Sequence, residues 1–199
     1  MPISTPVALF LTGPSGCGKT TVAQEWVRQE LPRGRCWTLL DKDVVGALYG
    51  PRLLAELGAD PHDRDSPIYK REVRQLDYGT TLRLAAEQLA LGGSVVLPGP
   101  WTRELVDGSV FEPTRLGLPA GTRSIAIWLS LPESERRRRI ERRGHAQDAW
   151  KLQNWETYAN GAASRPPVFT RQRPVEVDAQ RPLPELLELV RGVVEGSLG

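Results

Sequence analysis

Short, unbroken apolar runs recur along the chain and alternate with longer amphipathic stretches. Five of these runs predict β-strands, at residues 7–11, 36–40, 94–97, 123–129 and 175–177. Their residues do not alternate between apolar and polar, which is typical of strands that are buried on both faces. The chain is therefore expected to contain one buried sheet.

Between these runs, apolar residues recur at helical spacing. They form three stripes: Val22, Ala23, Trp26 and Val27; Leu76, Thr80, Leu84 and Leu91; and Leu183, Leu186, Leu187, Val190 and Val194. Strands that alternate with helices favour an α/β fold in which helices cover both faces of a parallel sheet.

A further, highly charged helix is predicted at residues 133–143. Ser130 and Glu133 have the spacing of a capping box, and Pro132 stands where a first helical residue would be. Gly144 is the expected stop of this helix.

Composition and charge narrow the class of protein. The 199 residues suit a single domain, residues 1–199, and the net charge of +2 is too small to indicate nucleic-acid binding. No apolar run approaches the roughly 20 residues that span a bilayer. With no signal peptide and only Cys17 and Cys36 as cysteines, we expect a cytoplasmic protein with reduced thiols.

The clearest motif follows the first predicted strand and opens a helix. It has the form G-x-x-x-x-G-K-T and consists of Gly13, Pro14, Ser15, Gly16, Cys17, Gly18, Lys19 and Thr20, with Thr21 next. Glycines let backbone N–H groups turn toward phosphate oxygens, and the helix N-terminus adds positive charge. Lys19 is expected to reach the β- and γ-phosphates, and Thr20 to hold Mg²⁺. The motif predicts a loop that binds ATP, with GTP as an open alternative.

Two carboxylates follow the second predicted strand, where parallel strands deliver their ends to a common crevice. Asp43 is the candidate base for an acceptor hydroxyl, and Asp41 is a candidate ligand of Mg²⁺. Each could instead cap the turn or helix that follows. The pair favours a kinase that transfers the γ-phosphoryl group to a hydroxyl.

This order of motifs resembles the small P-loop kinases of the shikimate, gluconate and adenylate kinase fold. The resemblance covers nearly the whole chain and is greatest to the zeta-toxin and chloramphenicol-phosphotransferase branch, through residues 39–43, 58–64 and 143–152. It implies a P-loop NTPase three-layer sandwich with strand order 2-3-1-4-5, a catalytic carboxylate at Asp43 and an arginine-bearing lid at residues 136–151. Relatives often carry a carboxylate where Pro98 stands and an arginine where Gln147 stands.

The predicted lid helix has a strong local charge, since residues 133–143 hold six arginines against three glutamates. Phosphoryl transfer needs positive charge at the equatorial oxygens, and a guanidinium fork fits phosphate. Arg139 and Arg143 are therefore predicted to be catalytic, and Arg142 to bind the nucleotide. Arg137 and Arg138 are predicted to face solvent.

Residues 49–74 are expected to cover the acceptor, and residues 176–182 to run beside the adenine. Besides Asp41 and Asp43, the candidate acceptor residues are Arg52, Arg64, Arg74, Trp101 and Arg103. Mixed charges and aromatic groups suit a polar organic acceptor, such as an antibiotic, nucleoside, sugar or amino-acid derivative.

Two alternatives stay open. A polynucleotide 5′-hydroxyl kinase is disfavoured, because no continuous basic and aromatic track for a strand is present. A nucleotide-binding regulatory module without catalysis is favoured by Pro98 and disfavoured by Asp41 and Asp43. The expected partner is a small-molecule acceptor, with no membrane, and the expected state is a monomer or homodimer.

Overall fold

The computed structural model describes residues 5–161, 164 and 172–196. The five predicted strands form one sheet with parallel pairing throughout. They are β1 (Val7–Thr12), β2 (Trp37–Leu39), β3 (Ser94–Pro98), β4 (Arg123–Ser130) and β5 (Val175–Asp178). The order β2-β3-β1-β4-β5 confirms the sequence prediction.

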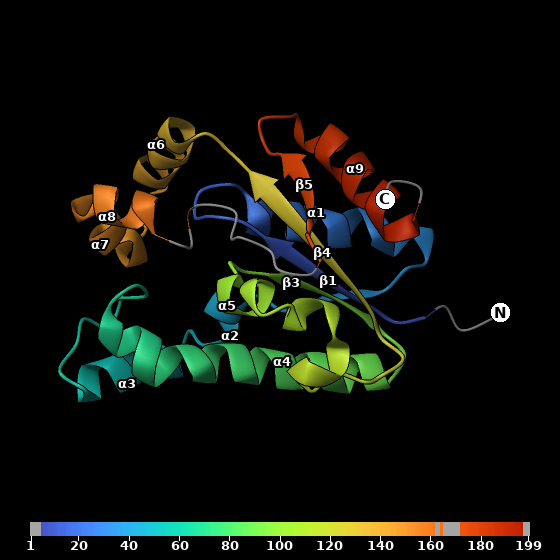
Figure 1. Ribbon diagram of the computed structural model, residues 1–199, viewed down its shortest axis with the longest axis horizontal. Helices are drawn as coiled ribbons and strands as arrows, with labels where there is room; N and C mark the ends of the chain where they lie inside the picture. The colour runs from blue at the N-terminus through green and yellow to red at the C-terminus, as the bar shows by residue number, and fades with distance from the viewer. Residues whose placement is uncertain (1–4, 162–163, 165–171, 197–199) are drawn as a thin grey trace.

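Two helical layers cover this sheet (Figure 1). Leu9 and Leu11 of β1 belong to a core shared with α1 (Lys19–Glu30) and α9 (Leu183–Glu195). Ala8 and Phe10 belong to a second core, shared with α4 (Arg74–Ala90) and α5 (Thr102–Val106). Because successive side chains of a strand point to opposite faces, a strand between two cores is apolar at every position.

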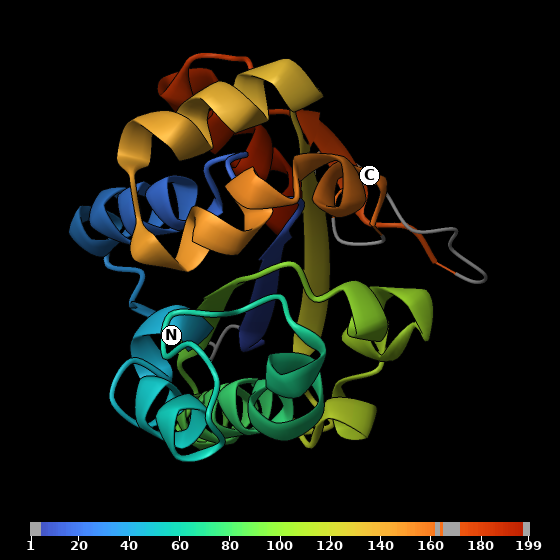
Figure 2. The ribbon, with the colours of Figure 1, turned by 90° about the vertical axis from the view of Figure 1, so that its left-hand side faces the viewer.

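The remaining helices lie near the ends of the strands, on the side where the phosphate-binding loop is found. They are α2 (Lys42–Val45), α3 (Tyr49–Glu56), α6 (Glu133–Arg143), α7 (Ala149–Gln153) and α8 (Trp155–Asn160). Figure 2 shows α6, α7 and α8 on one side of this face and α2 and α3 on the other. Among the described residues, no helix is long and apolar enough to cross a membrane.

The apolar stripe predicted for the long helix is on the wrong face. Leu76 and Leu84 of α4 are 47% and 43% exposed. The buried face carries Asp77, Tyr78, Thr81, Ala85 and Leu89 instead. Asp77 is accommodated there because its carboxylate accepts a hydrogen bond from the Tyr69 hydroxyl at 2.8 Å. Tertiary partners thus made a polar residue compatible with burial.

Helix α6 confirms the predicted charged helix, and Gly144 ends it with φ of 59°. The predicted capping box is wrong, because Ser130 still belongs to β4 and its hydroxyl donates to the Val177 carbonyl at 3.3 Å. Pro132 precedes the helix, and no side chain caps it. The Glu133 carboxylate accepts from the Trp155 indole at 2.9 Å and so ties α6 to α8.

Candidate functional site

The loop between β1 and α1 is the base of the site. Gly13, Gly16 and Gly18 have φ values of 126°, 84° and 96°, which residues with a Cβ rarely adopt. A Cβ on Gly13 would lie 2.5 Å from the Leu129 carbonyl oxygen, and a Cβ on Gly16 2.8 Å from that of Arg136. The loop can therefore pass under β4 and α6 only with glycine at these positions.

Two side chains hold the loop in place, Lys19 at its C-terminal end and Tyr158 on α8. Nζ of Lys19 donates to the carbonyls of Gly13 and Pro14, at 2.8 and 2.7 Å. The backbone N–H of Ser15 donates to the hydroxyl of Tyr158 on α8, at 2.9 Å. The Lys19 ammonium is thus held within the loop, at the N-terminus of α1, where it could contact a bound phosphate.

Thr20 and Asp41, the two predicted metal ligands, are in contact. The Thr20 hydroxyl donates to Oδ2 of Asp41 at 3.0 Å, while Oδ1 of Asp41 accepts from the backbone N–H of Asp43 at 2.9 Å and caps α2. Burial raises the pKa of Asp41, and the charge of Asp43 adds to the rise.

These two side chains fit a magnesium ion. Mg²⁺ prefers oxygen ligands, and a buried carboxylate whose pKa is raised gains from a nearby cation. The described residues contain no group of three or more histidine, cysteine, aspartate or glutamate side chains that could hold a metal by themselves. With Mg²⁺ bound, Thr20 and Asp41 would form a partial ligand set, of the kind that nucleotide phosphates and water complete.

Asp43 lies at the start of α2, and its carboxylate is 41% exposed. Nζ of the buried Lys42 is 2.5 Å from its Oδ1. Partial burial would raise the pKa of Asp43, but Lys42 holds it below the usual value, with help from the charges of Lys151 and Arg64. Asp43 thus has a lowered pKa and an exposed carboxylate, two properties that suit a base for an acceptor hydroxyl. Lys42 is a site residue that the sequence prediction missed, although it stands between the two carboxylates.

A pocket of about 570 Å³ opens beside the loop. Its lining comes from the loop and α1 (Gly16, Cys17, Gly18, Thr21, Val22), from α6 (Glu135, Arg138, Arg139, Arg142, Arg143), from the segment after β5 (Ala179, Arg181) and from the start of α9 (Leu183, Leu186). This volume is typical of small-molecule sites. The phosphate loop, the lid helix and the loop predicted to run beside the adenine therefore meet in one cavity.

The lid arginines divide between this pocket and solvent. Nη1 of Arg139 approaches Gly18, 3.9 Å from the position that a Cβ would take there, and its Nε donates to Glu135 at 3.0 Å. Arg137 is half exposed and pairs with Glu141, as predicted for a solvent-facing residue. Arg138 also pairs with Glu135 and is largely exposed, yet it lines the pocket. Arg138 was predicted to face solvent, and the structure adds that it also lines the pocket.

Arg143 is held by a buried carboxylate. Its Nε and Nη2 donate to Oδ2 and Oδ1 of Asp148, at 2.6 and 2.7 Å. Asp148 is completely buried. The sequence prediction missed this partner, because a single aspartate after a helix stop carries no signal of its own.

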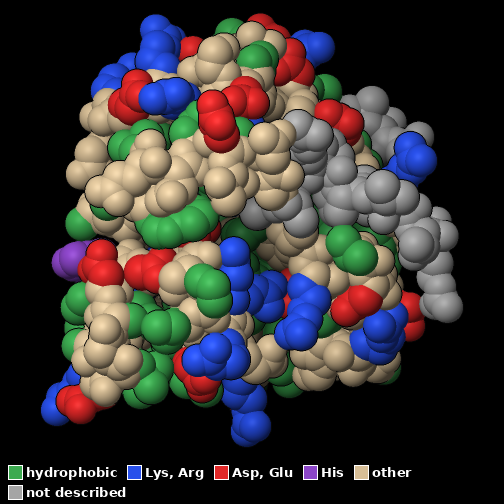
Figure 3. All heavy atoms as spheres, turned by 60° about the vertical axis from the view of Figure 1, so that its left-hand side comes forward, with side chains coloured by type: hydrophobic (Ala, Val, Ile, Leu, Met, Phe, Trp, Pro, Cys, Tyr) green, Lys and Arg blue, Asp and Glu red, His purple; other side chains and the backbone are tan. Residues whose placement is uncertain are grey.

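Of the predicted acceptor residues, Arg64 lies near Asp43, and Arg74 lies on the Tyr78 ring, which Lys42 also approaches. Arg64 lies over the Tyr69 ring at 5.7 Å, and its charge contributes to the low pKa of Asp43. Arg74 lies over the Tyr78 ring at 3.9 Å and donates to both carboxylate oxygens of Glu104, at 3.0 and 3.2 Å. Figure 3 shows Lys and Arg side chains gathered beneath the hollow in the middle of this face.

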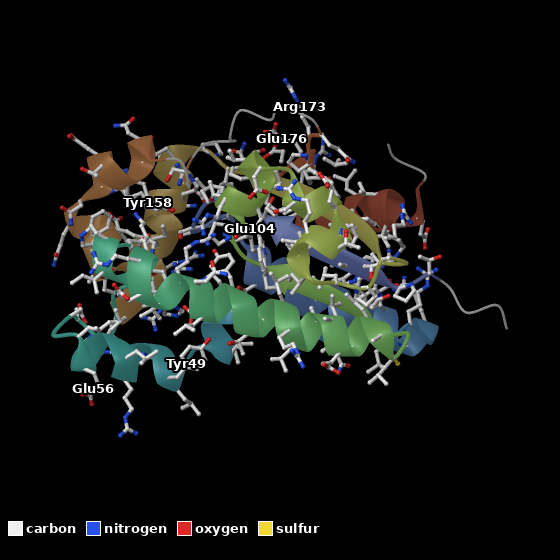
Figure 4. The ribbon with its side chains drawn as sticks, turned by 60° about the horizontal axis from the view of Figure 1, so that its bottom comes forward. Tyr49, Glu56, Glu104, Tyr158, Arg173 and Glu176 are labelled. Carbon is white, nitrogen blue, oxygen red and sulfur yellow. The ribbon has the colours of Figure 1, made fainter. Side chains whose placement is uncertain are left out.

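The structure places the other three acceptor candidates apart from these. The Trp101 side chain is fully buried between Phe10 and Tyr78, so it packs beneath the site and does not line it. Arg103 is exposed on α5. Arg52 lines a separate, mostly apolar pocket of about 400 Å³ between α3 and α4. Two other residues of that pocket, Tyr49 and Glu56, lie away from Glu104 and Tyr158 in Figure 4.

Residues 9–163 match the model of the family AAA_33, described as "AAA domain". The match begins in β1 and extends beyond α8, over more than half of the chain. The chain belongs to this family, which agrees with its phosphate-binding loop.

Several similar proteins are kinases. The adenylyl-sulfate kinase of Rhodopirellula baltica is 33% identical in an alignment of 124 residues that covers 56% of this chain and 48% of that protein. The match therefore spans about half of the relative's length. The APS kinase of Mycobacterium tuberculosis in complex with AMPPNP and APS has a TM-score of 0.64 at 20% identity, over 96% of this chain and 98% of that one.

Two further solved structures share the fold. A sugar kinase from a Janibacter species has a TM-score of 0.65 at 17% identity, over 96% of this chain and 95% of that one. A gluconokinase from Sinorhizobium meliloti has a TM-score of 0.54 at 21% identity, with the same coverage of both chains. The protein thus has the fold of the P-loop kinases, as the sequence predicted.

Proposed function

We propose that the protein is an ATP- and Mg²⁺-dependent phosphotransferase that moves the γ-phosphoryl group to a hydroxyl of a small molecule. One observation carries the proposal. Asp43, an exposed carboxylate with a lowered pKa, lies two residues after Asp41, which contacts Thr20 beside the phosphate-binding loop. A protein that only binds nucleotide has no need of a base at this position. The names of the similar proteins support the same class of reaction.

The residues have complementary tasks in this reaction. Lys19 and the loop N–H groups bind the phosphates, and Arg139, Arg142 and Arg143 supply positive charge from the lid. Asp43 orients the acceptor hydroxyl and takes its proton as the oxygen bonds to the γ-phosphorus. The bond from that phosphorus to the β–γ bridging oxygen breaks, and ADP leaves. Mg²⁺ held by Thr20 and Asp41 would neutralise phosphate charge when bound.

We also propose which residues contact the acceptor and which branch of the P-loop kinases the protein resembles. Arg64 and Arg74 would contact a polar organic acceptor, and the segments at residues 58–64 and 143–152 support a place in the zeta-toxin and chloramphenicol-phosphotransferase branch. Arg52 and Arg103 keep a role only if the acceptor extends toward α3 or α5. We further expect a cytoplasmic enzyme, either monomeric or homodimeric.

A screen for acceptor-dependent ADP release tests the proposal. Purified protein with Mg-ATP is offered antibiotics, nucleosides, sugars, amino-acid derivatives and 5′-hydroxyl oligonucleotides, with the Lys19→Ala variant as the blank. We expect one class of small hydroxyl compound to stimulate ADP release by the wild type alone. Tight nucleotide binding with no stimulation by any compound would favour the regulatory module. Stimulation by oligonucleotides alone would favour the polynucleotide kinase.

A further inference from the structure

A buried carboxylate on the lid holds two cations at once. Asp148 receives the two hydrogen bonds from Arg143, at 2.6 and 2.7 Å, and its Oδ1 accepts a third from Nζ of Lys151 at 3.2 Å. The side chain of Asp148 is fully buried, that of Lys151 is 7% exposed and that of Arg143 is 34% exposed. The bidentate pair fixes the plane of the Arg143 guanidinium, while the exposed part of the side chain lines the nucleotide pocket.

Lys151 also reaches across to the segment that covers the acceptor. Its Nζ lies 2.9 Å from Oδ2 of Asp65, as an ion pair without hydrogen-bond geometry, and it donates to the Gln147 carbonyl at 3.3 Å. Asp65 and Lys151 are 86 residues apart in the sequence, so the ion pair joins the segment between α3 and α4 to α7. An unbroken series of charged contacts therefore runs from Asp65 through Lys151 and Asp148 to Arg143.

The turn that carries Asp65 also carries Arg64. Oδ1 of Asp63 accepts from the backbone N–H groups of Asp65 and Ser66, at 2.8 and 3.0 Å. Arg64 donates to the carbonyls of Pro61 and Asp63, at 3.1 and 2.7 Å. A group that binds Arg64 and moves this turn would move Asp65 with it.

The four charged groups have no net charge, since two are positive and two are negative. We expect them to contribute little to the free energy of folding. Removing two ions from water costs about as much as their attraction returns, so a buried ion pair is weak evidence for stability. Its main effect is geometric, because a buried charge that loses its partner is strongly unfavourable. Arg143 is therefore confined to the orientation that Asp148 accepts, and Asp148 to the one that Lys151 and Asp65 accept.

We propose that Asp65, Lys151 and Asp148 are positioning residues for Arg143, and that they couple the acceptor-covering segment to the lid. The inference rests on the proposed function, in which Arg143 acts on the transferred phosphoryl group. It assigns a role to three residues that do not themselves touch the nucleotide pocket. Arg143 is then correctly placed only when the turn at residues 60–66 is docked against α7.

The first test of the coupling needs no turnover. Amide exchange is measured on the full chain for wild type, Asp65→Asn and Lys151→Met, alone and with Mg²⁺ and a non-hydrolysable ATP analogue. Glu141→Gln, which breaks a surface ion pair on α6, is the matched control. We expect Asp65→Asn to speed exchange at residues 143–151, Lys151→Met to speed it at residues 60–66, and the control to do neither. Unchanged exchange in the conservative, folded Asp65→Asn variant overturns the coupling.

The second test asks whether the three residues act through Arg143. Slow hydrolysis of Mg-ATP, with water as the acceptor, is measured for Asp148→Asn, Arg143→Ala and the double variant. We expect Asp148→Asn to lower kcat on the order of tenfold, within the range of coupling inside one charged network, with little change in KM for ATP. The double variant should be no slower than Arg143→Ala. Additive losses, or a loss confined to KM, overturn the positioning role. If the wild type hydrolyses no ATP with water, the same variants are compared with the acceptor found in the screen. A wild type that turns over ATP with neither water nor any acceptor overturns the proposed function, while the exchange result still decides the coupling.

Discussion

The Thr20 hydroxyl donates to the Asp41 carboxylate at 3.0 Å, although β2, which precedes Asp41, is not adjacent to β1. Strand β3 lies between them and ends at Pro98, where the family resemblance led us to expect a carboxylate. Asp41 therefore reaches past the end of β3 to the first turn of α1. If Thr20 and Asp41 hold Mg²⁺, as we propose, two oxygen ligands are in place without a carboxylate on β3.

Substitutions of the two carboxylates after β2 are expected to impair activity in different ways. Asp43→Asn should lower kcat by roughly 10²-fold or more while the affinity for ATP is kept, which is the scale of losing a general base. Asp41→Asn should instead raise the Mg²⁺ concentration needed for activity. Turnover measured against ATP and against Mg²⁺ separates the two effects. A nearly active Asp43→Asn beside an inactive Asp41→Asn would show that the roles are reversed.

The lid arginines provide a graded series. Arg139, Arg142 or Arg143 changed to alanine should lower kcat more than it weakens acceptor binding, because their charge serves the transition state. Arg137→Ala removes an exposed ion pair from the same helix and should be nearly silent. Steady-state kinetics of the four variants is the measurement. An equal loss of kcat in all four variants would indicate that α6 is only a solvent-exposed charged helix.

Glycine at position 16 is required by space as well as by conformation. Gly16→Ala combines a positive φ with a Cβ 2.8 Å from the Arg136 carbonyl oxygen. Gly34→Ala is the control, since its φ is 73° but no atom lies within 4 Å of a Cβ there. Denaturant unfolding should show a loss of about 1–2 kcal/mol for the control, the strain of a left-handed residue, and more for Gly16→Ala. Nucleotide affinity should fall only for Gly16→Ala, and equal behaviour would argue against the close approach of loop and α6.

The ion pairs of Asp148 predict a pH dependence of stability. Burial would raise the pKa of Asp148, but hydrogen bonds from Arg143 and the charge of Lys151 lower it below the usual value of 3.8. A carboxyl whose pKa is lower in the folded state stabilises that state above its unfolded pKa, and the contribution is lost as the pH falls through the folded value. The free energy of unfolding of Asp148→Asn should therefore differ most from wild type near neutral pH. The difference should shrink below about pH 4; a difference that is constant with pH would contradict it.

The sequence predicted the sheet well because its signals are local. The five apolar runs and the G-x-x-x-x-G-K-T motif each lie within a few residues, and the parallel order follows from the family resemblance. Helix α4 shows the limit of such signals. Its stripe of leucines indicated the core face, whereas the observed core face carries Asp77, whose carboxylate accepts a hydrogen bond from Tyr69 in the turn before the helix.

By itself, the sequence determined the fold class, the phosphate-binding loop and the candidate base, since backbone conformation and strand burial depend on neighbours in the chain. Only the tertiary structure decided which charged side chains meet. Asp148 with Arg143 and Lys151 with Asp65 are pairs that no spacing indicates. The physical reason is that a charged side chain can be buried only beside a partner of opposite charge or a hydrogen-bonding group, and these partners are brought together by folding rather than by the order of residues.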